Sequence, residues 1–391
     1  MSNLALSAVQ RGTSPSIEIR QISDLPELDR FEEEWHRLAE QGHQPQPFNS
    51  HAWVRAYLEH RLHRNERWIC LMAFLDGRLI GVLPLIIRRV RRLGVRGVVV
   101  ATPHDDQTTT VDVLARSGDE LTVVPLLINA AMSAAPDCFV LELKRLPIDS
   151  PTLAATRRAF RGRELQIASG LGSYLPIGAD FSKYRSSLSR NFRSNLSKAA
   201  NKIATHAVEF TIKRGSAATV DDLDEFMKVE AASWKGPEQT AILRRPDLVR
   251  FYLSLTRGLS RAGWLEWHIM RMDGRVIAVN LAIAVRSRLV VWKLGYDEMF
   301  SKLSPGSLLF EHVVSEAYAN GVTEIDLTSD ELWYDNWRMN KRRYQSLEVY
   351  PQGLRARLFG YWPRRLSLFL LRVPVPRAIT LGLRRLRGSR S

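Results

Sequence analysis

Four carboxylates in the second half of this 391-residue chain are of a type suited to general-base chemistry: Glu230, Asp326, Asp330 and Glu331. A carboxylate held beside an attacking nucleophile can take its proton. Glu230 stands four residues before Trp234, so a helix places both on one face. Asp326 ends a predicted buried strand, where an acid is costly unless it is bonded. Taken singly, each carboxylate is better explained as an ion-pair partner or a helix cap; together they predict an acidic wall.

Residues 302–307 form a helix start that can bind an anion. Ser304 is predicted to cap the helix, Pro305 suits its first turn, and Gly306 permits close backbone approach. Free N–H groups and the helix dipole attract phosphate at such a place. The corresponding residues 117–120 of the first half include two carboxylates, which would repel it. Ser-Pro-Gly is also a common helix start without any ligand.

An internal repeat organises the elements that must position these residues. Three short patterns recur in the same order, 195 residues apart for two of them and 197 for the third. Three matches at nearly one offset indicate duplication of a domain rather than a short-period solenoid. The pairs are Leu28–Phe31 with Leu223–Phe226, Val54–Leu58 with Val249–Leu253, and Asp76–Val82 with Asp273–Val279.

Each copy predicts two helices, a hairpin around Asp-Gly, a further strand, a helix and a closing strand. This order indicates a mixed α/β (α+β) fold, in which each half is a mixed sheet flanked by helices. The expected helices are 28–40, 52–63, 121–134, 220–233, 246–262 and 307–320. The expected strands are 69–75, 79–88, 97–102, 138–143, 265–272, 276–285, 288–294 and 322–327.

The same pattern sets the expected domain limits. We expect a disordered N-terminus over residues 1–16, a first domain over 17–165 and a second, donor-binding domain over 166–353. A basic amphipathic tail follows over 354–391. Within the second domain, the segment 181–203 is predicted to be a helical connector between the copies.

Two of these segments carry the excess positive charge of +15. The tail holds ten arginines and no acid, and the segment 181–203 holds six bases and no acid, whereas the rest is balanced. Concentrated basic patches predict anionic partners: phospholipid headgroups, a phosphorylated cofactor or RNA. A solvated basic surface without a partner is the alternative for each.

An apolar stripe in the tail predicts a helix lying on a membrane surface. Leu358, Trp362, Leu366, Phe369 and Leu370 recur at helical spacing beside arginines, which is typical of an interfacial helix. The inner face of the plasma membrane is therefore an expected partner. A helix packed on the body of the protein would need the same stripe.

Several classes of protein are excluded by composition. Two cysteines, Cys70 and Cys138, cannot build a disulfide framework or a Cys-rich zinc site. No apolar run approaches the roughly 18 residues of a spanning helix. The N-terminus lacks the basic head and apolar core of a secretory signal. These features predict a cytoplasmic protein with free thiols, and no third ligand accompanies His104, Asp105 and Asp106 for a metal.

Seven short motifs between Phe31 and Tyr350 resemble one known family. They are Pro47–Trp53, Val82–Leu85, Leu188–Leu196, Glu230–Gly236, Gly295–Gly306, Gly321–Leu327 and Tyr334–Trp337. The chain resembles the GNAT-like (GCN5-related N-acetyltransferase) family that includes CelD-type cellulose-biosynthesis proteins. It is similar more remotely to Fem-type aminoacyltransferases, which are also tandem GNAT folds.

The resemblance implies an acyltransferase with acyl-CoA, acetyl-CoA in particular, as co-substrate and no metal. Tyr296 would protonate the leaving sulfur, or serve only as a strand-end aromatic, and Glu230 and Asp326 are the expected catalytic carboxylates. Backbone N–H groups near Leu294 would polarise the thioester carbonyl. The expected donor-binding residues are Lys293, Leu294, Lys302, Ser304, Pro305, Gly306 and Ser307.

The resemblance also implies an amino or hydroxyl acceptor from polysaccharide or envelope biosynthesis, such as a small-molecule or lipid-linked sugar. The expected substrate-binding residues are Asp105, Asp106, Trp234, Lys235, Asp330, Tyr334 and Trp337. Ser329 and Asp335 stand where the family commonly has Gly and Lys, which puts the choice of donor or acceptor in doubt.

Three alternatives remain open. An acidic acyl carrier protein could be the donor, since it would suit the basic segment 181–203. A Fem-like enzyme would use aminoacyl-tRNA, although the few aromatics of that segment argue against nucleic acid. A degenerate tandem GNAT could instead act as a non-catalytic scaffold of a polysaccharide synthase.

Overall fold

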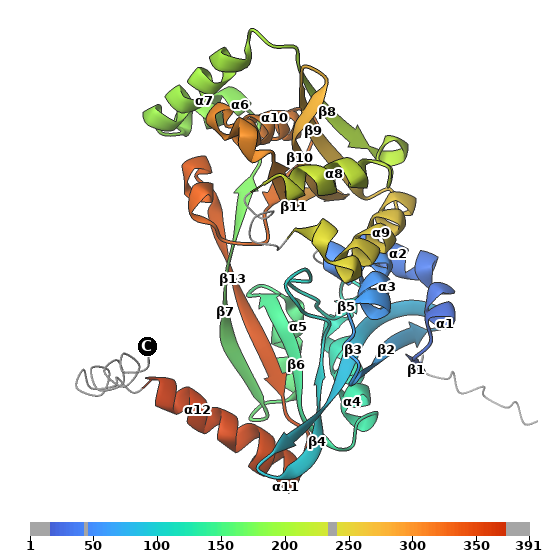
Figure 1. Cartoon of the computed structure of the whole chain (residues 1–391). Coiled ribbons are helices and arrows are strands. Elements are labelled where there is room, and N and C mark those ends of the chain that lie inside the picture. Colours follow the sequence, from blue (N-terminus) through green and yellow to red (C-terminus); the bar gives the residue numbers. More distant parts are fainter. Residues whose placement is uncertain (1–15, 43–45, 234–240, 373–391) are drawn as a thin grey trace, which may run out of the picture.

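The computed structural model describes residues 16–42, 46–233 and 241–372 (Figure 1). The predicted hairpins form at Asp76-Gly77 and Asp273-Gly274, where all four residues have positive φ, as a type I′ turn requires. The first half comprises β1 (Ile17–Ile22), α1 (Leu25–Asp29), α2 (Glu32–Gln41), α3 (His51–His60), β2 (Glu66–Leu75), β3 (Arg78–Arg92), β4 (Val95–Ala101), β5 (Leu114–Ala115), α4 (Glu120–Ser133), β6 (Cys138–Pro147), α5 (Pro151–Ala159) and β7 (Glu164–Pro176).

The second half repeats this order after two connecting helices. It comprises α6 (Phe181–Ser187), α7 (Arg190–Ile203), β8 (Val208–Arg214), α8 (Asp222–Ala231), α9 (Pro246–Arg261), β9 (Leu265–Met272), β10 (Arg275–Val285), β11 (Arg288–Tyr296), the 3-10 helix η4 (Glu298–Leu303), α10 (Pro305–Ala319), β12 (Glu324–Asp326), the 3-10 helix η5 (Leu332–Trp337) and β13 (Asn340–Val349). The tail follows as α11 (Leu354–Ala356), a π-helical turn (Arg357–Tyr361) and α12 (Trp362–Arg372).

Three expected elements differ from the structure. The helix predicted over 28–40 is two helices, because Phe31 leaves the helical conformation between α1 and α2. The connector 181–203 is also two helices, because Ser189 caps a new one by accepting a hydrogen bond from the Phe192 N–H. The strand predicted over 322–327 shortens to β12, because Thr328 takes a left-handed conformation with φ 58°.

The strands of both halves join one continuous sheet, and the halves exchange strands. Within the described residues the order is β1-β2-β3-β4-β6-β13-β7-β12-β11-β10-β9-β8. The last strand of the first half, β7, pairs with β12 of the second, and β13 of the second half pairs with β6 of the first. The domain limit expected between residues 165 and 166 therefore falls inside β7, and neither range contains all strands of its sheet.

One hydrophobic core spans the two halves. Helices α3 and α9 approach so closely that a Cβ on Gly258 would lie 2.7 Å from the Ala52 Cβ. Trp53 of α3 packs edge-on against Trp292 of β11, with ring centroids 4.5 Å apart. This packing fixes the first half against the strand on which the candidate site is built. Among the described residues, no helix is both long and apolar enough to cross a bilayer.

Candidate functional site

The candidate site lies where β11 separates from β12. Strand β11 pairs with β10 along its whole length, but with β12 only over Arg288–Val290. From Val291 to Tyr296 its other edge has no strand partner among the described residues. The register against β10 also slips at Trp292, a β-bulge that bends the strand. The backbone groups near Leu294 therefore line an open edge, which an extended ligand with amide groups can pair with.

The start of α10 faces the end of this open edge. A Cβ on Gly306 would lie 3.3 Å from Cδ1 of Tyr296, so the Tyr296 ring packs directly against the first turn of the helix. Pro305 has no N–H, and Ser307 donates its N–H to the Ser304 carbonyl. The Gly306 N–H is left as the first backbone donor of α10 without an acceptor among the described residues, so it can receive an anion.

The predicted side-chain cap at Ser304 is wrong. Ser304 takes a left-handed conformation with φ 53°, and its hydroxyl makes no capping hydrogen bond. Its carbonyl instead accepts the N–H groups of Ser307 and Leu308. The Ser304 hydroxyl therefore does not compete with a ligand for the first N–H groups of α10.

The corresponding helix start in the first half carries two carboxylates of its own, although neither caps the helix. Glu120 accepts the N–H of Gly118 at 2.8 Å, and Asp119 is paired with Arg116 at 2.5 Å. An incoming phosphate would meet these two acids at the start of α4. The contrast between the two halves makes α10 the better place for an anionic ligand.

Basic side chains surround the start of α10. Lys302 is exposed and has no ion-pair partner among the described residues. Its carbonyl accepts a hydrogen bond from Lys202 Nζ at 3.2 Å, which places the basic helix α7 beside η4. Lys293 lies on β11 with its Nζ 5.0 Å from the centre of the Trp292 ring. Lys302 and Lys202 therefore give the start of α10 a positive potential.

Tyr296 is held in its protonated form at neutral pH. Partial burial and the negative charge of Glu298 raise the pKa of its phenol above the ordinary value of about 10. The turn that follows is fixed by Asp297, whose Oδ1 accepts the Met299 N–H at 3.0 Å. Asp297 also forms an ion pair with Arg275. Tyr296 is thus a positioned O–H donor at the end of the open edge.

Glu230 lies at the same end of β11. A Cβ on Gly295 would lie 3.6 Å from the Glu230 Cα, so α8 packs directly over the strand there. The Glu230 side chain is 3% exposed, and its Oε2 accepts the Ile242 N–H at 2.9 Å. The structure therefore places Glu230 beside Gly295. The predicted contacts Trp234 and Lys235 lie outside the described residues.

Asp326 lies on β12 and is committed to a buried ion-pair network. Its Oδ2 pairs with Arg288 and, at 2.7 Å, with Arg342, while its Oδ1 accepts the Thr328 N–H at 2.7 Å. Both carboxylate oxygens of Asp326 are therefore already engaged by partners inside the protein. These contacts agree with the ion-pair role that the sequence left open for Asp326 beside that of a catalytic carboxylate.

The remaining predicted residues of the second half are also engaged. Asp330 pairs with Lys341 and accepts a hydrogen bond from Ser173 at 3.0 Å. Tyr334 and Trp337 are 3% and 1% exposed, and belong to the core beneath α10. Packing accounts for both aromatic residues, so a direct substrate contact would require them to move.

Asp105 and Asp106 are held at the junction of the halves. Arg61 binds Asp105 at 2.7 Å and Asp106 at 2.9 Å, and it also reaches Asp247 of α9 at 2.6 Å. These bonds fix the loop rather than leaving two free carboxylates. The predicted acceptor contacts therefore stand in an ion-pair cluster.

Tyr252 and Trp292 connect the loop of Asp105 and Asp106 to the open edge of β11. Tyr252 donates its O–H to Gln107 at 2.8 Å, and its ring stacks on Trp292 at 5.1 Å. Sequence reasoning missed Tyr252 and Trp292 as parts of the site. Tyr252 belongs to the repeated pattern Val249–Leu253, and this repeat could have indicated its position in the fold. No local sequence pattern marks the bulge at Trp292.

Comparison with known proteins agrees with this fold. Residues 190–336 match the family model described as acetyltransferase (GNAT) domain. The solved structure titled "Crystal structure of FemX" is similar at 11% identity and a TM-score of 0.59, covering 88% of this chain and 99% of that one. The C-terminal domain of a putative lysylphosphatidylglycerol synthetase from Agrobacterium fabrum is also similar at 11% identity and a TM-score of 0.50, covering 82% and 92%. A search of curated protein sequences gives no match.

These likenesses confirm the predicted fold class. The chain is a mixed α/β protein with a large mixed sheet flanked by helices, and the match to the GNAT domain model covers most of its second half. The open edge of β11, Gly306 and Tyr296 all lie within the matched range, and so does Glu230.

Proposed function

We propose that the protein is an acyltransferase that moves an acyl group from acyl-CoA to an amino or hydroxyl acceptor in the second half of the chain. The observation that carries the proposal is the difference between the two helix starts. Glu120 and Asp119 place two carboxylates at the start of α4, whereas Gly306 of α10 offers an N–H without an acceptor among the described residues. A phosphate-bearing donor is favoured only in the second half.

Acyl-CoA supplies a thioester and the phosphates that anchor it. The start of α10 would hold the pyrophosphate, and the open edge of β11 would pair with the amides that lead to the thioester. Backbone N–H groups near Leu294 would polarise its carbonyl. Lys302 and Lys202 would balance the phosphate charge. The pocket needs no metal in this scheme, because backbone donors can stabilise the developing oxyanion.

Two side chains of the site divide the proton transfers between them. Glu230 would take the proton from the acceptor's N–H or O–H, directly or through one water, as the nucleophile attacks the carbonyl carbon. The carbon–sulfur bond then breaks, and Tyr296 would give its proton to the leaving sulfur. We assign no proton transfer to Asp326, since Arg288, Arg342 and the Thr328 N–H engage both of its carboxylate oxygens.

The acceptor we propose is a sugar of polysaccharide or envelope biosynthesis. The resemblance of the motifs to CelD-type proteins supports this choice. The cluster around Arg61 would shape the acceptor side of the site, because Tyr252 connects its loop to Trp292.

Calorimetric titration of the full chain with CoA and acetyl-CoA tests the donor site. Saturable binding is expected for the unaltered protein, and Gly306→Glu should abolish it by placing a carboxylate where the phosphate binds. Ser117→Glu is the matched control, since it adds the same charge beside α4. Equal affinity in Gly306→Glu and the control, with both folded by circular dichroism, would refute the assignment.

A second donor class is favoured by one contact. Lys202 joins the basic helix α7 to the carbonyl of Lys302, so a polyanion bound along α6 and α7 would reach the same helix start. An aminoacyl-tRNA would fit that description. Absence of CoA binding, together with tRNA binding that is lost in Lys202→Glu, would favour this function; absence of both would favour a scaffold.

A further inference from the structure

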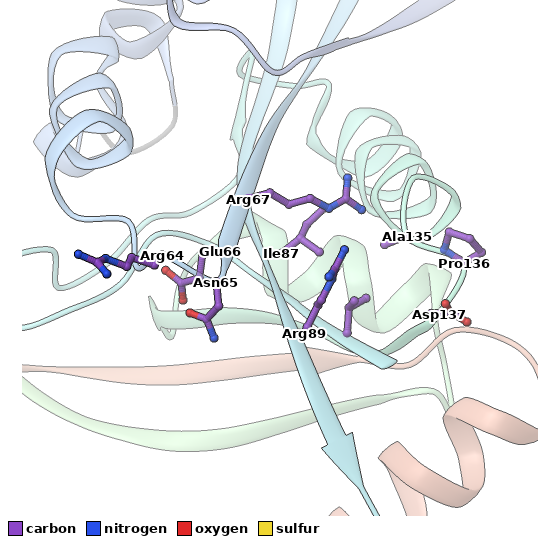
Figure 2. Close-up of a pocket in the computed structure, with 10 residues that line it drawn as sticks. Arg64, Asn65, Glu66, Arg67, Ile87, Arg89, Ala135, Pro136 and Asp137 are labelled. Atoms are coloured by element: carbon purple, nitrogen blue, oxygen red, sulfur yellow. The ribbon is translucent and has the colours of Figure 1, made fainter. Parts of the chain in front are cut away.

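A groove lined by arginines lies far from α10, along the sheet of the first half. Its first part has a volume of about 670 Å³ and lies beyond the end of α4. Figure 2 shows Arg67 and Arg89 reaching into it from neighbouring strands, with Asp137 at its rim. A second part of about 640 Å³ continues along β3 and β4 and shares Arg89 and Asp137. We call the two parts the arginine groove; its arginines are Arg64, Arg67, Arg89, Arg91, Arg96 and Arg355.

The positive charge of the arginine groove is largely uncompensated. Among the residues that the structure describes, Glu66 and Asp137 are the only carboxylates that line it. Asp137 lies 3.4 Å from Arg355, and that is the one ion pair of the groove within the described part of the chain. Six guanidinium groups against two carboxylates form a site for several phosphate groups rather than for a neutral ligand.

Exposed apolar side chains stand beside the groove. Leu93, at the tip of the β3–β4 hairpin, is 84% exposed, and Leu354 of α11 is 75% exposed. The hairpin and the tail are tied together, because Arg92 donates to the Phe359 carbonyl at 3.1 Å and Arg355 donates to the Arg96 carbonyl. Two segments far apart in the sequence therefore present leucines at the same end of the molecule (Figure 1).

Helix α12 extends this apolar surface. Trp362, Leu366, Phe369 and Leu370 follow one face of the helix and are 56–64% exposed. Arg364 anchors the opposite side by a 2.9 Å ion pair with Glu348 on β13. Large side chains left in water on one helix face, with arginines beside them, are typical of a helix that lies in a lipid interface.

We propose that the arginine groove, the β3–β4 tip and α12 together bind the surface of an anionic phospholipid bilayer. Lipid phosphates would occupy the groove, while Leu93 and the exposed face of α12 enter the headgroup region. Charge complementarity and the apolar rim around the same arginines carry the proposal. The surface lies at the end of the sheet away from α10 and β11, so it does not depend on the proposed acyl transfer (Figure 1).

Binding of the full chain to vesicles tests the proposal. Vesicles of equal parts phosphatidylcholine and phosphatidylglycerol should co-sediment with the protein, whereas phosphatidylcholine alone should not. Arg89→Glu with Arg96→Glu should weaken binding by at least about 25-fold, since each basic residue near an anionic surface contributes roughly five-fold. Arg158→Glu with Arg257→Glu changes the net charge equally at exposed positions and should leave binding within about two-fold.

A label at the hairpin tip tests insertion. Cys70 and Cys138 are both buried, and burial raises the pKa of each thiol, so they should resist labelling. An environment-sensitive dye on Leu93→Cys should therefore report the tip alone. Its emission should shift to the blue with the anionic vesicles and not with phosphatidylcholine.

Three outcomes would overturn the proposal. Equal losses in the groove variant and the control would show a net-charge effect without a site. Saturable binding of inorganic phosphate or glycerophosphate by the groove, without vesicle binding, would assign it to a free ligand. Tighter binding of an RNA oligonucleotide, with the same dependence on Arg89 and Arg96, would assign it to nucleic acid. The rate of acyl transfer should be unchanged in every variant, because the proposed donor site lies at the other end of the sheet.

Discussion

Gly306 in the first turn of α10 and Tyr296 at the end of β11 are in contact, with only 3.3 Å between an added Cβ and the tyrosine Cδ1. Gly306 thus has two effects: its N–H can receive an anion, and its lack of a side chain leaves room for the ring of Tyr296, the proposed acid. In the proposed mechanism, donor binding and proton delivery would be coupled at this contact. The contact joins the end of β11 to the start of α10, although Tyr296 and Gly306 are ten residues apart in the sequence.

Replacement of Tyr296 by phenylalanine should lower kcat by about 100-fold while leaving KM for acetyl-CoA nearly unchanged. The reason is that the O–H acts only as the carbon–sulfur bond breaks. Release of free thiol under saturating donor is the measurement. An unchanged kcat would assign the ring to packing, which is the alternative for this residue.

Gly306→Ala should also lower kcat, because the new methyl group meets the Tyr296 ring and displaces its O–H. In the Tyr296→Phe background the same substitution should cost little more, since the O–H is already absent. The double-mutant cycle should therefore show a coupling of about 1 kcal/mol or more between the two positions. Additive losses would mean that Gly306 and Tyr296 act independently.

The pH at which activity falls on the alkaline side should depend on the negative charge of Glu298. A nearby negative charge disfavours the phenolate, and the pKa of Tyr296 is raised by burial and by Glu298. Activity that needs the protonated phenol should persist above pH 10 and fall beyond the raised pKa. Glu298→Gln removes the charge, lowers the pKa of Tyr296 and should move the alkaline limb of the kcat profile to lower pH.

The matched control for this pH profile is Tyr296→Phe. It should lack that alkaline limb altogether while retaining the low residual rate. A limb that stays in place in both variants would belong to another group.

Asp326→Asn should destabilise the protein rather than switch off a base. The substitution leaves Arg288 and Arg342 without their shared buried partner, and breaking a buried ion pair typically costs about 3 kcal/mol or more. Glu324→Gln at the more exposed edge of the same network should cost less, about 1 kcal/mol. Urea unfolding measures both; a stable but inactive Asp326→Asn would restore this residue as the catalytic base.

The local elements could be predicted from the sequence, because each rests on short-range signals. Apolar periodicity indicated the helices, and the two Asp-Gly pairs indicated the hairpins that the structure shows at Asp76 and Asp273. The left-handed conformation of Ser304 could not be foreseen, since serine is an ordinary helix cap and the conformation depends on how η4 meets α10.

The sequence could predict where the candidate site lies, but not which partners its side chains have. The motif Gly295–Gly306 indicated the helix start, and the structure shows Tyr296 beside it. The ion-pair partners of Asp326 could not be predicted from the sequence, because Arg288 is 38 residues away and Arg342 lies on β13, a strand that joins the two halves of the sheet. The arginine groove likewise draws on residues from 64 to 355, which no local pattern connects.

The strand exchange has a consequence for the order in which the protein is made. Leu141 of β6 pairs with Val349 of β13, so the first half cannot finish its sheet until nearly all of the described chain has left the ribosome. During that interval the β6 edge is exposed, and unpaired edges invite aggregation. Translation speed and chaperone supply should thus limit the yield of native protein, and two separately expressed halves should fold well only when each can lend its strand to the other.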